Sequence, residues 1–174
     1  MKKWLFYIAF LISLIFVVIN ILDVNSYIEQ RNKESLFQGQ EITKSIANHI
    51  DSLLKQIMDE GKSIAAKISS DNLKKPELLE LIKSRSEKHN PILGITAAFE
   101  PNTFDKNTNL YAPYYDKNQN KFIFIEDVYN YTDKDLKTSQ WYIKVINNGS
   151  KWIEPYFAQG AKTLVVDYGT PIID

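Results

Sequence analysis

An uncharged apolar run near the start of the chain constrains its fold more than any other feature. The segment from Trp4 to Leu22, WLFYIAFLISLIFVVINIL, contains one Asn and no charged residue. At a rise of 1.5 Å per residue, a helix of this length spans roughly 28 Å, about the hydrocarbon thickness of a bilayer. We therefore predict a transmembrane helix over residues 4–22.

The alternative to a membrane anchor is a cleaved secretory signal, because Lys2 and Lys3 form a basic segment before the apolar run. The run is longer than the apolar part of a typical signal, and the DVNS that follows offers no small-residue cleavage site. We favour an uncleaved anchor. The basic residues before the helix predict that residues 1–3 are cytoplasmic and that residues 23–174 are outside the cytoplasm.

Composition excludes several classes of function. The formal net charge is zero, so the chain lacks the basic surplus that nucleic-acid binding requires. Cysteine is absent, which excludes disulfides, thiolate metal sites and a cysteine nucleophile. An exported domain of this kind must be held together by its core.

Residues 23–70 have the pattern of one long amphipathic helix. They contain no proline. Apolar residues recur at steps of three, four and seven, at Ile42, Ile46, Ile50, Leu53, Leu54, Ile57, Ile64 and Ile68. If this helix continues the anchor, it forms a stalk of roughly 70 Å. The apolar stripe can cover a sheet, pair with a second copy in a homodimer, or do both.

The remaining residues, 71–174, predict a sheet-rich unit, and together with the helices they give an α+β fold. Pro76 is suited to the first turn of a second helix, PELLELIKSRSEK, which Pro91 ends. Predicted strands cover residues 92–100, 110–115, 121–128 and 163–170, with a further strand from 171. Thr132 is predicted to cap a short helix that is rich in acids in its first turn.

We predict no catalytic residues, no metal site and no cofactor. The chain has no Ser, His and acid grouping and no phosphate-binding glycine loop. D-x-N-x-N occurs at Asp105 and at Asp116, but Leu110 and Lys121 stand where a calcium loop needs glycine. Turns built on Asn and Asp side chains explain this pattern better.

Aromatic side chains are the strongest functional signal. Only two occur in residues 24–90, whereas 15 occur in residues 91–174. Most are Tyr or Trp, whose polar tips need partners and whose rings suit the wall of a small-molecule pocket. The other interpretation is a core of Trp141, Trp152 and Phe157 with tyrosines at its rim.

Several segments in order resemble a known family. GITAAFEPNTFD, YAPYY, a WY pair and WIEPYFAQGAKTLVVDYGTPI follow a membrane anchor and a long stalk. Together they resemble the first, membrane-distal module of a double Cache sensor domain of bacterial transmembrane receptors. The likeness covers roughly residues 23–174, and the ordered set is more specific than any one piece.

The resemblance implies a PAS-like antiparallel sheet module with a ligand cavity, in a receptor of the bacterial plasma (inner) membrane. It further implies that the chain continues into a second module, a second membrane helix and a cytoplasmic output domain, such as a chemotaxis or histidine kinase domain. In such a module Trp141 and Tyr142 would roof the cavity, with Tyr156 on its far side. The predicted ligand-binding residues are Tyr114, Tyr131, Trp141, Tyr142, Tyr156 and Asp167.

One departure bears on the ligand. Amino-acid-binding members carry an Arg two residues before the Trp, where this chain has Ser139, which cannot form a bidentate pair with a carboxylate. An α-amino acid is therefore not supported. An amine could instead be held by an acid, for which the candidates are Asp127, Asp133, Asp135 and Asp167, and the alternative for each of these is an ordinary solvated acid.

We thus expect a small-molecule sensor that is tethered to the membrane and has no enzymatic activity of its own. The alternative is an anchored domain that binds a protein or the cell wall through its aromatic surface. An enclosed cavity would favour the sensor, and a contiguous exposed aromatic area would favour the alternative.

Overall fold

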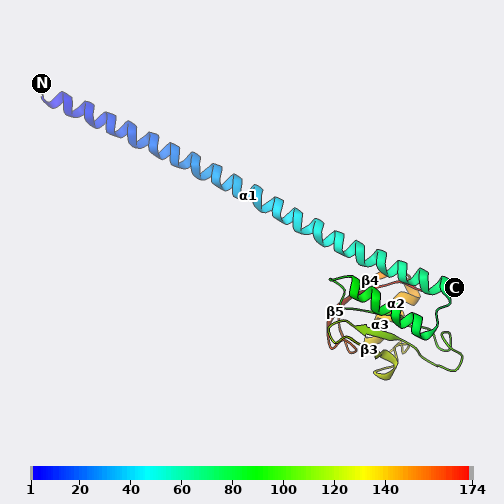
Figure 1. Ribbon diagram of the computed structural model, residues 1–174. Helices are drawn as coiled ribbons and strands as arrows, with labels where there is room; N and C mark the ends of the chain where they lie inside the picture. Colours follow the sequence, from blue (N-terminus) through cyan, green and yellow to red (C-terminus); the bar gives the residue numbers. More distant parts are fainter. Residues whose placement is uncertain (1, 173–174) are drawn as a thin grey trace. The chain divides into compact units, whose positions relative to one another are not determined.

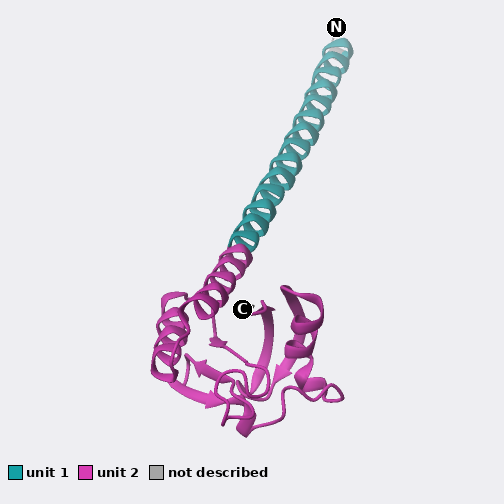
Figure 2. Ribbon diagram, turned by 90° about the vertical axis from the view of Figure 1, so that its right-hand side faces the viewer, with its two compact units in different colours: residues 1–52 teal, residues 53–174 magenta. Residues whose placement is uncertain are grey.

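The computed structural model describes residues 2–172, in an α+β arrangement that confirms the predicted class (Figure 1). The elements are α1 (Lys2–Asp71), α2 (Lys75–Lys88), β1 (Gly94–Thr96), β2 (Pro113–Asp116), β3 (Lys121–Phe124), the 3-10 helices η1 (Ile125–Asp127) and η2 (Lys137–Ser139), α3 (Gln140–Asn148), β4 (Lys151–Ala158) and β5 (Thr163–Gly169). The chain forms two compact units, residues 1–52 and 53–174, which Figure 2 colours separately.

Helix α1 is continuous over 70 residues, so the predicted apolar segment and stalk belong to one helix. Its apolar N-terminal part is long enough to cross a membrane, and the side chains of that part are exposed. Two polar side chains in this part bond to the helix backbone. Ser13 Oγ donates to the carbonyl of Phe10 at 2.8 Å, and Asn20 Nδ2 donates to that of Phe16 at 2.7 Å. These internal bonds suit an apolar surrounding, where water cannot serve as a partner.

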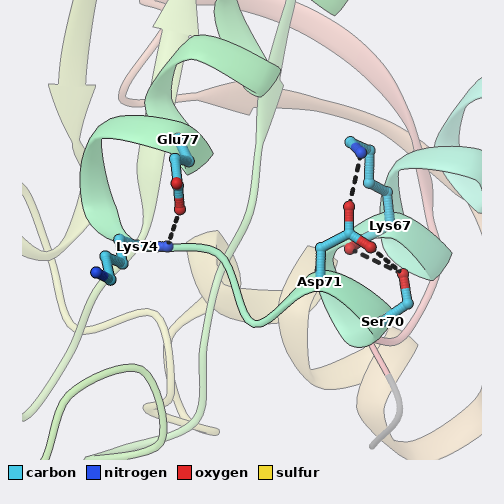
Figure 3. Close-up of polar contacts among 5 residues, drawn as sticks. All are labelled: Lys67, Ser70, Asp71, Lys74 and Glu77. Carbon is cyan, nitrogen blue, oxygen red and sulfur yellow. Dashed lines mark hydrogen bonds and ion pairs between the residues drawn. The ribbon is translucent and has the colours of Figure 1, made fainter.

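Side-chain bonds mark the end of α1 and the start of α2 (Figure 3). Asp71 accepts from Lys67 Nζ and from Ser70 Oγ, both at 2.6 Å, in the last turn of α1. The Glu77 carboxylate accepts from the backbone N–H of Lys74 at 2.8 Å and thereby satisfies a donor at the start of α2. The predicted second helix is confirmed.

The strands form two antiparallel sheets, one with the order β1-β2-β3 and one of β4 and β5. The predicted hairpin across DKNQN is confirmed as β2 and β3, in which Tyr114 pairs with Ile123. Three strands are shorter than predicted. β1 ends at Thr96, β2 begins only at Pro113, and β3 passes into η1. Beyond the end of β1, the N–H of Phe99 still donates to the carbonyl of Tyr111 at 3.1 Å.

Each face of the three-stranded sheet packs into its own core. Tyr115 faces the side covered by α1 and α2, in a cluster with Ile64, Ile68, Leu78 and Ile82. The neighbouring residue on the strand, Tyr114, faces the opposite side, where it packs with Tyr131 and Tyr142. Successive side chains of a strand point to opposite faces of the sheet. One face therefore packs against α1 and α2, and the other packs against side chains of α3.

The predicted helix after Thr132 is wrong, because local side-chain bonds replace it. Asn130 Oδ1 accepts from the N–H of Thr132 at 3.0 Å, and Asp133 Oδ1 accepts from that of Asp135 at 2.9 Å. Turns of this kind compete with helix formation. The helix instead begins at Gln140.

Two further differences concern the strands near the end of the chain. β4 was not predicted, because Pro155 and a register shift between Ile153 and Tyr156 break the expected alternation. The strand predicted from residue 171 is not formed at 171–172, and its residues 173 and 174 lie outside the described residues. The D-x-N-x-N segments form turns as predicted, with Asp105 and Asp116 accepting from nearby backbone N–H groups.

Candidate ligand-binding site

The ribbon of β4 and β5 presents a tyrosine and a carboxylate side by side on its inner face. Tyr156 pairs with Val165, and Asp167 lies two residues further along β5, so both side chains are on the same side of the ribbon. The hydroxyl of Tyr156 donates a hydrogen bond to Asp167 Oδ2. Both residues are half-buried.

The charge of the Asp167 carboxylate affects the pKa values of two further tyrosines. Tyr114 comes from β2, and Tyr129 follows η1. Burial raises the pKa of Tyr114 to about 12, and the charges of Asp116 and Asp167 contribute in the same direction. Burial also raises the pKa of Tyr129, again with a contribution from Asp167. Tyr156 thus contacts Asp167 directly, whereas Tyr114 and Tyr129 lie near enough for its charge to affect their pKa values.

Asp167 itself sits in an environment that disfavours its charge. Burial raises the pKa of its carboxyl above the ordinary value, and the hydrogen bond from Tyr156 opposes this only in part. Among residues 2–172, the ion pairs involve other acids and leave Asp167 without a cationic side chain.

Helix α3 brings Trp141 to the same place. The indole Nε1 donates to the hydroxyl of Tyr129 at 2.8 Å, which fixes the ring against that phenol. Ser139 precedes the helix, is fully buried, and donates through Oγ to the carbonyl of Asn130 at 3.0 Å. Ser139 thus anchors the start of α3 rather than presenting its hydroxyl to a ligand. We name Tyr114, Tyr129, Trp141, Tyr156 and Asp167 the Asp167 cluster.

The other two predicted site residues lie in the same core as Tyr114 but have no interaction with Asp167. Tyr131 is fully buried, and its hydroxyl donates to the carbonyl of Phe99 at 2.6 Å and accepts from the N–H of Tyr111 at 3.1 Å. Tyr142 is also buried, with its ring edge-on to that of Tyr131 at 5.0 Å between centroids. Tyr131 packs against the Asp167 cluster, because its ring centroid is 6.2 Å from that of Trp141.

The structure thus brings four of the six predicted residues together, Tyr114, Trp141, Tyr156 and Asp167, and adds Tyr129. The spacing of the aromatics in the sequence gave no signal that Tyr129, rather than Tyr131, would lie in the cluster. The acids Asp127 and Asp135 are exposed, and Asp133 is engaged in its own turn, so Asp167 alone of the four candidates meets the rings.

Two surface hollows in the unit of residues 53–174 lie away from this cluster. One, of about 560 Å³, is lined by α1 between Lys62 and Ser70 and by Thr170 and Pro171. The other, of about 460 Å³, lies between the end of α1 and α2. Neither is lined by a predicted ligand-binding residue, so those assignments remain predictions.

Comparison with known proteins gives two matches. Residues 78–174 match the family described as the methyl-accepting chemotaxis protein-like, first PDC sensor domain. The chain is also similar to the solved extracellular domain of a protein designated histidine kinase soHK1S-Z6, with a TM-score of 0.61 and 27% sequence identity. This likeness covers 72% of the present chain and 49% of the solved one, so the chain spans about half the length of that domain. No curated protein matches the chain.

These matches confirm the Cache resemblance inferred from sequence, and the matched structure confirms the fold of a long helix followed by an antiparallel sheet module. The apolar part of α1 is compatible with a transmembrane helix and indicates a membrane-anchored sensor. The family match covers more than half of the chain. The chain therefore belongs to the methyl-accepting chemotaxis protein-like first PDC sensor domain family.

Proposed function

We propose that the chain is the extracytoplasmic, small-molecule-sensing part of a transmembrane receptor in a bacterial inner membrane. In this proposal residues 1–3 are cytoplasmic, residues 4–22 cross the membrane, residues 23–70 form a stalk, and residues 71–174 form the sensor module. The chain has no catalytic role of its own. The observation that carries the proposal is a set of linked side chains from separate elements, in which Tyr156 donates to the half-buried Asp167 carboxylate and Trp141 donates to Tyr129, with Tyr114 and Tyr129 near enough for the charge of Asp167 to raise their pKa values.

The proposed signal passes from the cluster to α1 through packed elements. Val145 of α3 lies so close to Gly169 of β5 that a Cβ on that glycine would meet it at 2.3 Å. The ring of Tyr168, the preceding residue on β5, lies against Gly61 of α1, where a Cβ would meet it at 3.3 Å. A ligand that shifts α3 on β5 would therefore bias α1, by an amount that is set by its differential affinity for the two states.

A thermal-shift screen of small solutes tests this function. The full chain, in detergent, is screened with wild type and the variants Trp141→Ala and Tyr156→Phe. A solute that stabilises the wild type should lose most of its effect in Trp141→Ala. Trp152→Ala is the matched control, because that indole packs at a tilt against Tyr168, outside the cluster. Solutes whose effect is the same in all variants would contradict the proposed site.

A second candidate function is binding of a protein or the cell wall. It is favoured by the outer face of the β4-β5 ribbon, where Phe157, Leu164 and Val166 are exposed. Exposed apolar patches of this kind often mark interaction surfaces. Replacing Leu164 with Asp should abolish such binding without changing the response to a small solute, and this separates the two functions.

We further propose that α1 pairs with a second copy of the chain. The support is that Ile42, Ile46 and Ile50 are exposed on one stripe of α1, whereas Ile64 and Ile68 of the same stripe are buried in the module. The surface that best matches such a long apolar stripe is the same stripe on α1 of a second copy of the chain.

A further inference from the structure

Glu60 is a buried acid on the part of α1 that packs against α2. Only 9% of the residue is exposed. Its Oε1 accepts a hydrogen bond from Arg85 Nη1 at 3.0 Å, and its Oε2 lies 3.2 Å from His89 Nε2. Arg85 is in the last turn of α2, and His89 is the residue at which α2 ends. One carboxylate of α1 therefore holds the end of α2 with both of its oxygens.

The contact between Glu60 and His89 favours the cationic form of the imidazole. His89 Nε2 is buried, and no described residue completes a hydrogen bond with it. A neutral ring therefore gains little from the contact, because a hydrogen bond requires an aligned donor. A protonated ring gains the attraction of the carboxylate, which depends on distance rather than on alignment. The contact thus stabilises the fold when His89 carries a proton.

The position of His89 at the end of α2 favours the same form. The last carbonyl groups of a helix carry partial negative charge, and a histidine cation beside them is stabilising. Histidine is the side chain that ordinarily changes its charge between about pH 5 and pH 8. Over this range the end of α2 therefore gains or loses an electrostatic bond to α1.

The other charges around His89 leave its contact with α1 dominant. Arg85 is paired with the same carboxylate, and Glu87 and Lys88, which directly precede His89, have opposite signs. Lys117, after β2, opposes a positive charge on the ring, but its Nζ contacts the backbone carbonyl of His89, at 3.1 Å. Since electrostatic energy falls with distance, the carboxylate at 3.2 Å from Nε2 has the larger effect on the ring.

This contact lies beside the place where β5 meets α1. Gly61 follows Glu60 directly, and the ring of Tyr168 lies so close to it that a Cβ on the glycine would meet the ring at 3.3 Å. A change at Glu60 therefore acts on the same turn of α1 that the β4-β5 ribbon contacts.

We propose that protonation of His89 strengthens the packing of α2 on α1, so that the attachment of the module to α1 depends on pH. The stabilisation is present near pH 5 and is lost as the pH rises toward 8, because only the protonated ring is attracted to Glu60. The inference goes beyond the proposed function. It involves no ligand, and His89 and Glu60 lie outside the Asp167 cluster.

Denaturant unfolding of the full chain in detergent, at about pH 5.5 and about pH 8, tests the proposal. His89→Gln keeps a polar side chain but has no charge at either pH. Its destabilising effect should be larger at the lower pH, by about threefold or more in the unfolding equilibrium constant. The contributions of other ionisable groups, Asp167 included, are common to variant and wild type and cancel in the difference.

His49→Gln is the matched control, because His49 is exposed on α1 and is the only other histidine of the chain. Its effect should be the same at both pH values. If His89→Gln also has the same effect at both, the proposal is wrong.

Glu60→Gln identifies the partner of the imidazole. In that background the effect of His89→Gln should no longer depend on pH, because the carboxylate that attracts the charged ring is gone. A pH dependence that persists there would overturn the role of Glu60 and, with it, the proposed link between α2 and α1.

Hydrogen exchange decides the matter without Glu60→Gln, which leaves Arg85 unpaired and can prevent folding. After correction for the pH dependence of chemical exchange, amide protection in residues 57–63 and 85–92 should fall about threefold or more from about pH 5.5 to about pH 8, relative to α3. In His89→Gln the same segments should show no such fall. Equal behaviour of wild type and variant would contradict the proposal and would leave the proposed ligand site untouched.

Discussion

The indole Nε1 of Trp141 donates a hydrogen bond to the hydroxyl of Tyr129 at 2.8 Å, and this bond joins α3 to the segment after η1. Trp141→Phe and Tyr129→Phe should each lower the free energy of unfolding by about 1 kcal/mol, and the double variant by less than the sum. Denaturant unfolding of the four proteins measures the coupling. Tyr27→Phe, on the exposed part of α1, should be additive with Trp141→Phe. Additive effects in both cycles would contradict the bond.

Asp167 should make the stability of the protein depend on pH. Burial raises the native pKa of Asp167 above its value in the unfolded chain, so the native state holds this proton to higher pH. Its ionisation therefore costs stability that grows as pH rises from about 4 through the native pKa. Asp167→Asn lacks this cost, so the difference in Tm between this variant and the wild type should change in the variant's favour from pH 4 to pH 7.

Asp127→Asn provides the control for that pH series, because Asp127 is exposed. Its Tm difference from the wild type should stay flat over the same range. A flat difference for Asp167→Asn as well would mean that water or Tyr156 compensates the charge fully.

Tyr131 should contribute more stability through its hydroxyl than an exposed tyrosine does. In Tyr131→Phe the N–H of Tyr111 and the carbonyl of Phe99 lose a shared partner inside the core. Leaving buried backbone groups unpaired costs about 1–3 kcal/mol. Chemical denaturation should show that loss for Tyr131→Phe and almost none for Tyr27→Phe. Ligand binding should persist in Tyr131→Phe, because its ring remains in place.

Tyr129 and Tyr131 illustrate what the sequence could and could not provide. They are two residues apart and have the same side chain, yet one lies in the Asp167 cluster and the other is fully buried. The aromatic enrichment predicted the region of the site. The division between core and cluster depends on an irregular segment of turns, in which neither helical nor strand periodicity assigns a direction to each ring.

The fold was more accessible from the sequence than the site. α1, α2 and the β2-β3 hairpin follow from long periodic patterns, from Pro76 and from the polar turn between the strands. β4 was missed because Pro155 sits within it, and the helix at Thr132 was wrong because Asn130 and Asp133 form local turns. Both errors arise where one side chain or one proline overrides a regional pattern.

Gly94 should be required for the position of Tyr114. A Cβ at Gly94 would lie 2.3 Å from the carbonyl oxygen of Tyr115 and 2.5 Å from the ring of Tyr114, so neither neighbour can be cleared by a small shift. Gly94→Ala should therefore cost about 2 kcal/mol of stability and weaken ligand binding. Gly39→Ala is the matched control. Nothing lies within 4 Å of that position on α1, and the change should stabilise the helix by about 1 kcal/mol.

The proposed pairing of α1 with a second copy can be tested in membranes, because the chain contains no cysteine and any cross-link must arise at an introduced one. Ile46→Cys lies on the exposed apolar stripe, whereas Lys44→Cys lies about 200° around the helix from it. Mild oxidation should yield a disulfide-linked dimer for Ile46→Cys and much less for Lys44→Cys, as expected if the stripe forms the seam of a two-stranded coil. Equal yields at the two positions would indicate random collision, and α1 would then act as a single helix.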